Sequence, residues 1–188
     1  MQQPKIALQI DELIDRFILN LEKRKIDITH ISNLQCGFEK WMQLEFIIWA
    51  INEYNLNPLN PEETGIGVEH FTKIIPPSRN WKIIDIWVGA KEKGFFYIEF
   101  KSTVKGWNTE KQISSWIDDF IILSNIHSDY KPYGIASVLF GSATEKWTDL
   151  SWKDFVVKRM YKSSIPTPNF KKIGNLGIAI LSKQNNKN

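Results

Sequence analysis

The amino-acid sequence predicts a single α/β domain in which helices flank a central β-sheet. Two runs rich in β-branched and aromatic residues, Ile83–Val88 and Phe95–Lys101, are typical of neighbouring strands. Helical patterns of apolar residues precede and follow this pair, and more apolar strands lie further along the chain. With 188 residues, the chain is about one domain and is long enough to bury a hydrophobic core.

The first part of the chain predicts two helices, a loop and a strand. Residues 6–24 place apolar side chains at helical spacing, and residues 37–54 are apolar over a wider arc. The prolines and glycines of residues 55–67 predict a loop. A strand over residues 68–75 then ends before Pro76.

The second part alternates helices with strands. After a hairpin over residues 82–102, Thr109 is a suitable N-cap for a helix that ends near Ile126. The remaining elements are an apolar strand 134–140, a helix 143–162 and a strand 176–181. We expect one domain over residues 1–182, in which helix 6–24 packs on a core of residues 37–182, and a disordered tail over residues 183–188.

Composition favours a cytoplasmic protein and leaves its partners open. The net charge of +3 is only mildly basic, so it permits nucleic-acid binding without requiring it. Cys36 is the single cysteine, which excludes an internal disulfide and suits a reducing compartment. No apolar stretch has the ~20 residues that span a bilayer, and no secretory signal is evident. The sequence also lacks the P-loop, G-x-S-x-G and H-E-x-x-H motifs.

The predicted hairpin places two acids opposite each other. Side chains alternate along a strand, so Glu99 and Lys101 share one face. Folding the hairpin symmetrically about Glu92 puts Asp85 opposite Glu99, with Cβ atoms roughly 5 Å apart. Facing acids stabilise a sheet poorly, but they suit a divalent metal ion, which prefers oxygen ligands.

A third acid is expected from helix 37–54. At 100° per residue, Glu45 falls in the middle of an arc that includes Trp41, Ile48 and Trp49. A carboxylate on a buried face needs a cation or a hydrogen-bond donor nearby, which favours Glu45 as the site acid. Glu39 is the alternative, although an acid in the first helical turn is also explained by the helix dipole.

This arrangement resembles the PD-(D/E)XK nuclease superfamily. The resemblance rests on Asp85 late in one strand, on Glu99-Phe100-Lys101 at the end of the next, and on the helices around them, and it covers roughly residues 37–140. Ile84 stands where the proline of the motif would be. The resemblance implies a restriction-endonuclease-like core and a Mg²⁺-dependent (or Mn²⁺-dependent) DNA endonuclease acting in restriction or defence, repair or recombination. A homodimer is implied as well, and RNA is not excluded as substrate.

The resemblance also implies roles for individual residues. Asp85, Glu99 and Glu45 would bind the metal, and the Phe100 carbonyl would add a ligand. Lys101 would orient the attacking water or stabilise the phosphorane, and burial beside the metal is expected to lower its pKa. Gln112, early in the helix after Lys101, matches a glutamine that several branches of the superfamily carry near the substrate or the catalytic lysine. Independently of the resemblance, Lys105 and Lys111 surround the expected mouth of the site, where cations suit a nucleic-acid backbone.

Two alternatives remain open on sequence alone. One is a non-catalytic nucleic-acid-binding or assembly factor that keeps the same core, although such a protein has no need of Asp85, Glu99 and Lys101 together. The other is a structural or regulatory domain without a nucleic-acid partner, which the small net charge allows.

Overall fold

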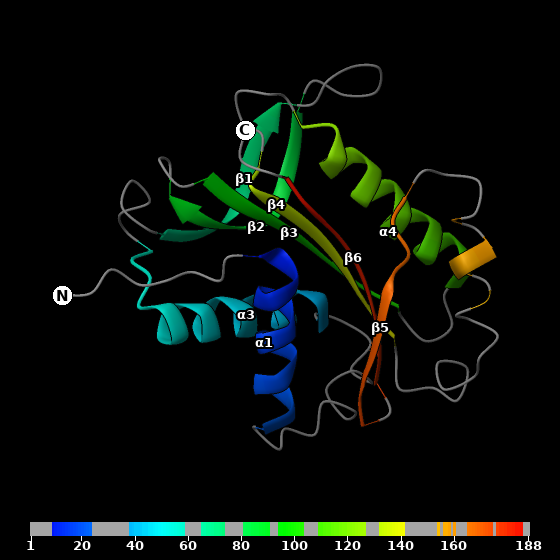
Figure 1. The fold of residues 1–188 in the computed structure, drawn as a ribbon, viewed down its shortest axis with the longest axis horizontal. Helices are drawn as coiled ribbons and strands as arrows, with labels where there is room; N and C mark the ends of the chain where they lie inside the picture. Colours follow the sequence, from blue (N-terminus) through cyan, green and yellow to red (C-terminus); the bar gives the residue numbers. More distant parts are fainter. Residues whose placement is uncertain are drawn as a thin grey trace.

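A computed structural model describes most of the chain. The described residues are 9–23, 38–58, 65–73, 81–90, 94–103, 109–126, 132–141, 154, 156–158, 160, 165–174 and 176–185. Its elements, drawn in Figure 1, are α1 Ile10–Lys23, α3 Phe38–Tyr54, β1 Gly65–Lys73, β2 Trp81–Ala90, β3 Gly94–Ser102, α4 Thr109–Ser124, β4 Gly134–Phe140, β5 Asn169–Ile173 and β6 Leu176–Gln184.

The strands form one six-stranded mixed sheet in the order β1-β2-β3-β4-β6-β5. β1, β2 and β3 are antiparallel neighbours in chain order. β4 is parallel to β3, so the chain must cross over between them, and α4 lies in that connection. β6 returns antiparallel to β4, and β5 pairs with the outer side of β6. The α/β class and the mixed sheet between helices are therefore as predicted.

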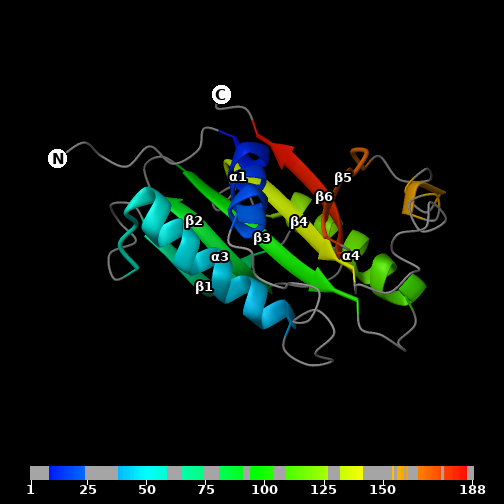
Figure 2. The ribbon, with the colours of Figure 1, turned by 90° about the horizontal axis from the view of Figure 1, so that it is seen from below.

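Helices cover both faces of the sheet. α1 and α3 lie on one side and α4 on the other, as Figure 2 shows. The α1–α3 side buries a cluster of aromatic rings in which Phe100 of β3 packs against Phe46 and Phe17, with ring centroids 5.7 and 6.3 Å apart. The α4 side buries Trp116 and Phe120 against Tyr97 and Leu139. Both faces of β3 and β4 are thus covered, which explains why every residue of β4 is buried and why all of them except Ser137 are apolar.

The predicted hairpin register is correct. Ile86 pairs with Ile98 and Ala90 pairs with Gly94, which is the pairing expected for a fold about position 92. Strand 134–140 was also predicted with its observed bounds. For the helix predicted over residues 143–162, the described residues 154, 156–158 and 160 are helical, and the others lie outside the described part.

The C-terminal end differs from the prediction. β6 continues through Gln184, so the expected disordered tail was wrong for Lys183 and Gln184. The Gln184 side chain accepts a hydrogen bond from the Ile10 N–H (2.9 Å) and donates one to the Tyr133 carbonyl (2.8 Å). Asn185 donates to the Pro132 and Tyr133 carbonyls. Polar residues here are ordered because they supply hydrogen bonds that backbone groups of α1 and the start of β4 require.

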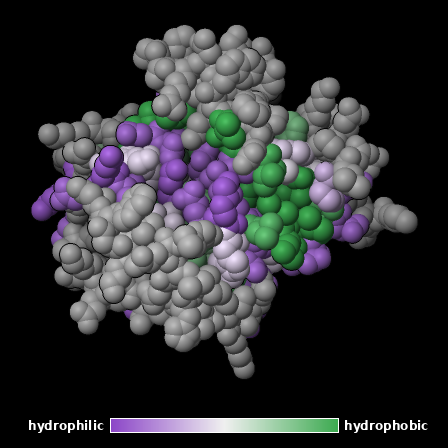
Figure 3. Space-filling view, turned by 180° about the vertical axis from the view of Figure 1, so that it is seen from behind, coloured by the Kyte–Doolittle hydropathy of each residue, from purple (hydrophilic) through white to green (hydrophobic). Residues whose placement is uncertain are grey.

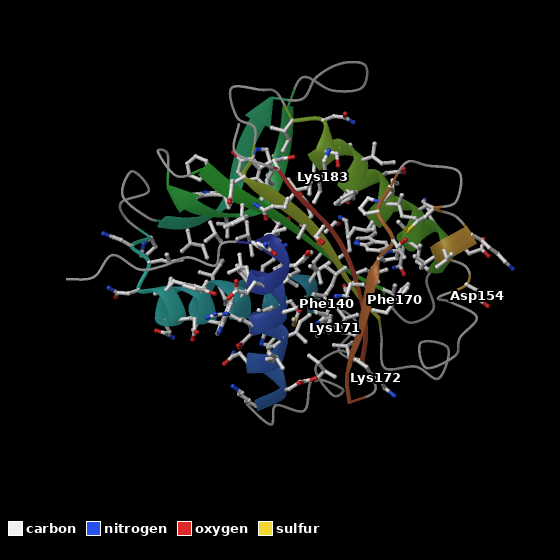
Figure 4. All side chains as sticks on the ribbon, in the orientation of Figure 1. Phe140, Asp154, Phe170, Lys171, Lys172 and Lys183 are labelled. Carbon is white, nitrogen blue, oxygen red and sulfur yellow. The ribbon has the colours of Figure 1, made fainter. Side chains whose placement is uncertain are left out.

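β5 was not predicted. Its sequence, Asn169–Ile173, contains two lysines and reads as polar, but lysine on an edge strand is a common way to discourage pairing with other chains. Lys171 forms an ion pair with Asp15 of α1 (2.8 Å), whereas Lys172 is exposed at the outer end of the strand. Figure 4 labels both side chains on β5, the outer strand of the sheet.

Candidate functional site

The candidate site lies where β2 and β3 part. Their ladder ends at the Ile86–Ile98 pair, so Asp85 and Glu99 are the next residues on each strand. Beyond that pair, a side chain replaces the backbone acceptor: the Asp85 Oδ2 accepts a hydrogen bond from the Phe100 N–H at 3.0 Å. Asp85 is thereby held against the strand that carries Glu99 and Lys101.

An irregularity in β2 explains how Asp85 reaches that position. Ile84 is buried in the α4-side core, whereas Ile86 is buried in the α1–α3-side core. A regular strand would place both side chains on the same face. The alternation of side chains along β2 is therefore interrupted at Asp85. The Asp85 side chain points toward β3, whereas regular alternation predicted that it would project from one face of the sheet.

Among the described residues, Glu99 is the one charged residue that is buried. Only 2% of it is exposed, and it pairs in the β3–β4 ladder with Ser137, which is fully buried. Tyr97 packs in the α4-side core, so Glu99 and Lys101 also face α4 by alternation. Burying a carboxylate here is costly unless cations or donors surround it.

Lys101 has a partner that the sequence did not reveal. Its Nζ lies 3.2 Å from Asp119 Oδ2, and the two side chains are only 31% and 14% exposed. Asp119 projects from α4 on the same stripe as Trp116 and Gln112, at i, i+4 and i+7 spacing. That spacing marks Asp119 as an inward-facing acid, but it does not tell which strand residue the acid meets.

The pKa of Lys101 lies above its ordinary value. Burial lowers it, but Asp119 and then Glu39 and Glu99 act in the opposite direction, and the net pKa lies above 10.5. Lys101 is therefore protonated at neutral pH. An electrostatic role suits it better than the role of a general base.

The helix acid near the site is Glu39. Burial raises the pKa of Glu39, the Asp85 carboxylate raises it further, and Lys101 and the Ser102 N–H oppose the rise. The hydrogen bond from the Ser102 backbone places the Glu39 carboxylate at the end of β3, within electrostatic reach of Asp85.

The face assignment that favoured Glu45 was wrong. The buried side of α3 centres on Phe46, with Met42, Ala50 and Trp49, whereas Ile48 is 48% exposed. At 100° per residue, Glu39 lies only about 20° from Phe46, and Glu45 lies about 100° away. Glu45 is half-buried at the margin of that face, and it makes contacts of its own.

The residues predicted to bind nucleic acid are only partly described. Gln112 is half-buried and Lys111 is exposed, both in the first turn of α4. Lys105 lies outside the described residues. On the face seen in Figure 3, hydrophilic side chains lie beside an apolar area.

A divalent metal ion fits this site only with ligands beyond its carboxylates. Among the described residues, no three His, Cys, Asp or Glu side chains lie close enough to hold a metal by themselves. Asp85 and Glu99 nevertheless supply hard oxygen donors from adjacent strands, and Glu39 stands near Asp85. Mg²⁺ usually binds one or two carboxylates and keeps several waters, so this donor set is compatible with it.

Comparison with known proteins found no match to the chain among family models, curated proteins or solved structures. No helix in the described part of the chain is both long and apolar enough to cross a membrane. The fold and the site together define an α/β protein whose six-stranded mixed sheet, flanked by helices, carries a carboxylate–lysine cluster where β2 and β3 part.

Proposed function

We propose that this protein is a metal-dependent endonuclease that hydrolyses phosphodiester bonds in DNA. The main support is the hydrogen bond that holds Asp85 against Phe100, because it joins the first acid to the Glu99-Phe100-Lys101 strand end. The order α3, β1, β2, β3, α4, β4, with β4 parallel to β3, also agrees with a restriction-endonuclease-like core.

The chemistry follows from charge. Hydrolysis builds negative charge on the phosphoryl oxygens as water attacks phosphorus, and a bound Mg²⁺ or Mn²⁺ would polarise the phosphate and acidify its water. Asp85 and Glu99 would hold that ion, and the Phe100 carbonyl would be a further oxygen ligand. Lys101, whose ammonium pairs with Asp119, would stabilise the developing charge. Glu39 adds a third carboxylate near Asp85, and a bound cation would offset the repulsion between these negative charges.

We also propose that two copies act together. One chain carries one set of Asp85, Glu99 and Lys101, whereas a DNA duplex has two strands to cut. Light scattering of the full chain, alone and with a duplex, tests this: a mass of twice 22.0 kDa is expected. A strictly monomeric protein that cuts both strands of a duplex would contradict the dimer without affecting the chemistry.

Cleavage assays with variants test the main proposal. The wild-type protein with Mg²⁺ or Mn²⁺ should cut plasmid or linear DNA, and the ion should raise its melting temperature, since it binds only the folded site. Asp85→Ala and Glu99→Ala should lose both effects. Lys101→Ala should lose cleavage but keep most of the stabilisation, because lysine is not a ligand.

Asp118→Ala is the matched control, since Asp118 is an exposed acid on α4 one residue from Asp119, and it should behave as wild type. RNA substrates in the same assay decide between the two nucleic acids. If the ion stabilises the protein but no nucleic acid is cut, the protein is a binding or assembly factor and the nuclease proposal is wrong. Folded protein that shows neither effect would exclude the metal site.

A further inference from the structure

The ion pair between Lys101 and Asp119 links the strand end of the site to the helix across it. Lys101 is the last charged residue of β3, and Asp119 lies in the middle of α4. The pair is partly buried, with Nζ and Oδ2 3.2 Å apart, so water and salt screen it less than a surface pair. Asp119 therefore has a marked influence on where the Lys101 ammonium rests.

The ammonium has other carboxylates within electrostatic reach. Glu39 and Glu99 both interact with it, and Glu39 in turn lies near Asp85. A lysine without its own partner on α4 would settle on these acids. It would then compete with any divalent cation for the same oxygen atoms, because both are cations that need the same negative charge.

We infer that Asp119 is a positioning residue that holds the Lys101 ammonium on the α4 side of the site, so that the Asp85 and Glu99 carboxylates stay open to a divalent ion. This inference rests on the proposed function for its substrate, but its main consequence is for metal binding. In this arrangement Asp119 would act through Lys101, which it contacts, and not as a ligand of the metal.

Two simpler roles for Asp119 predict different behaviour. If Asp119 only clamps α4 to the sheet, removing it should lower stability and leave metal affinity alone. If Asp119 only adds negative charge to the site, removing it should weaken metal binding whether or not Lys101 is present. The positioning role predicts that the effect of Asp119 on metal binding disappears once Lys101 is gone.

A double-mutant cycle on the full chain separates these roles. Mn²⁺ affinity is measured by titration calorimetry for wild type, Asp119→Asn, Lys101→Ala and the double variant, with circular dichroism to confirm folding. Asp119→Asn should bind Mn²⁺ about three- to tenfold more weakly and cut DNA at least about tenfold more slowly. The double variant should bind Mn²⁺ as tightly as Lys101→Ala alone.

Two further variants complete the design. Asp119→Glu keeps the carboxylate and should restore Mn²⁺ affinity to near that of wild type, and Asp118→Asn, on the exposed side of α4, should change nothing. Asp119→Ser is the second neutral variant if Asp119→Asn does not fold. If wild type binds Mn²⁺ and cuts DNA but Asp119→Asn matches it, or if the loss of affinity persists without Lys101, the inference is wrong and the nuclease proposal stands. If wild type neither binds Mn²⁺ nor cuts, the nuclease proposal fails and the inference fails with it.

Discussion

The Asp85 carboxylate and the Phe100 backbone N–H are joined by a hydrogen bond of 3.0 Å across the β2–β3 pair. The Phe100 ring is fully buried among Phe46, Phe17 and Phe140 on the α1–α3 side of the sheet. One residue therefore anchors a site acid through its backbone and the aromatic core through its side chain. The position of the acid is tied to the rigidity of that core.

This hydrogen bond predicts a difference between two substitutions of Asp85. Asp85→Ala leaves the Phe100 N–H without its acceptor and should lower the free energy of unfolding by about 1–3 kcal/mol. Asp85→Asn keeps an acceptor oxygen and should lose much less stability, although it should also lose the metal-dependent effects. Urea denaturation in EDTA measures the comparison. Equal losses for the two variants would mean that the hydrogen bond contributes little.

The raised pKa of Glu39 predicts a pH-dependent effect of its replacement. The folded protein binds a proton at Glu39 more tightly than the unfolded chain, because burial and then Asp85 raise its pKa above 4.5. The free energy of unfolding therefore falls as pH rises above 4.5 through the folded-state pKa of this group. Glu39→Gln removes that loss, so in EDTA at pH 7 the variant should melt at a higher temperature than wild type.

The advantage of Glu39→Gln should shrink as the pH is lowered below 4.5, where the wild-type carboxyl is protonated in both states. Glu45→Gln is the control, since Glu45 lies at the margin of the buried face of α3. Melting curves from pH 4 to pH 8 make the comparison. A Glu39→Gln advantage that grew toward low pH would have the wrong sign for this explanation.

Gln184 should contribute to stability although it stands near the end of the chain. Its side chain satisfies the Ile10 N–H at the start of α1 and the Tyr133 carbonyl next to β4. Gln184→Ala should therefore cost about 1–2 kcal/mol. Lys183→Ala, at the exposed neighbouring position, should stay within about 0.5 kcal/mol of wild type. Chemical denaturation of both variants measures the difference, and equal stabilities would contradict the capping role.

Gly134 should not tolerate a larger side chain. A Cβ added there would lie 2.9 Å from the Phe96 ring and 3.0 Å from Ile10 Cβ, where α1 approaches β4. Gly134→Ala should therefore push α1 away from the sheet and cost about 1–3 kcal/mol. Thermal and urea unfolding measure this cost. A neutral result would mean that α1 adjusts its position freely.

Most of the fold was visible in local patterns. Alternation in Phe95–Lys101 and the short connection after Ala90 were enough to predict the β2–β3 register, because a strand has a period of two residues and a tight hairpin leaves one symmetric pairing. β4 was visible because both its faces are covered, so all its residues except Ser137 are apolar. β5 was missed because an edge strand can carry lysines, which gives it the composition of a loop.

The helix acid could not be chosen from sequence because α3 is apolar on nearly all sides. Leu44 and Ile48 are 57% and 48% exposed, yet they are as apolar as the buried Met42 and Phe46. Periodicity alone therefore did not show which side of the helix meets the sheet. Packing against α1 and β3 decided it, and this brought Glu39 to the site.

The sequence by itself determined the β2–β3 hairpin, its register and the identity of Asp85, Glu99 and Lys101 as a candidate group, because those features depend on neighbours within a hairpin. Only the tertiary structure decided that Asp85 bonds to the Phe100 N–H, that Glu39 joins the group and that Asp119 holds Lys101. Asp119 and Lys101 are 18 positions apart on different elements. Their contact depends on how α4 lies across the sheet, and the rotation of a helix on a sheet is set by the packing of the whole core.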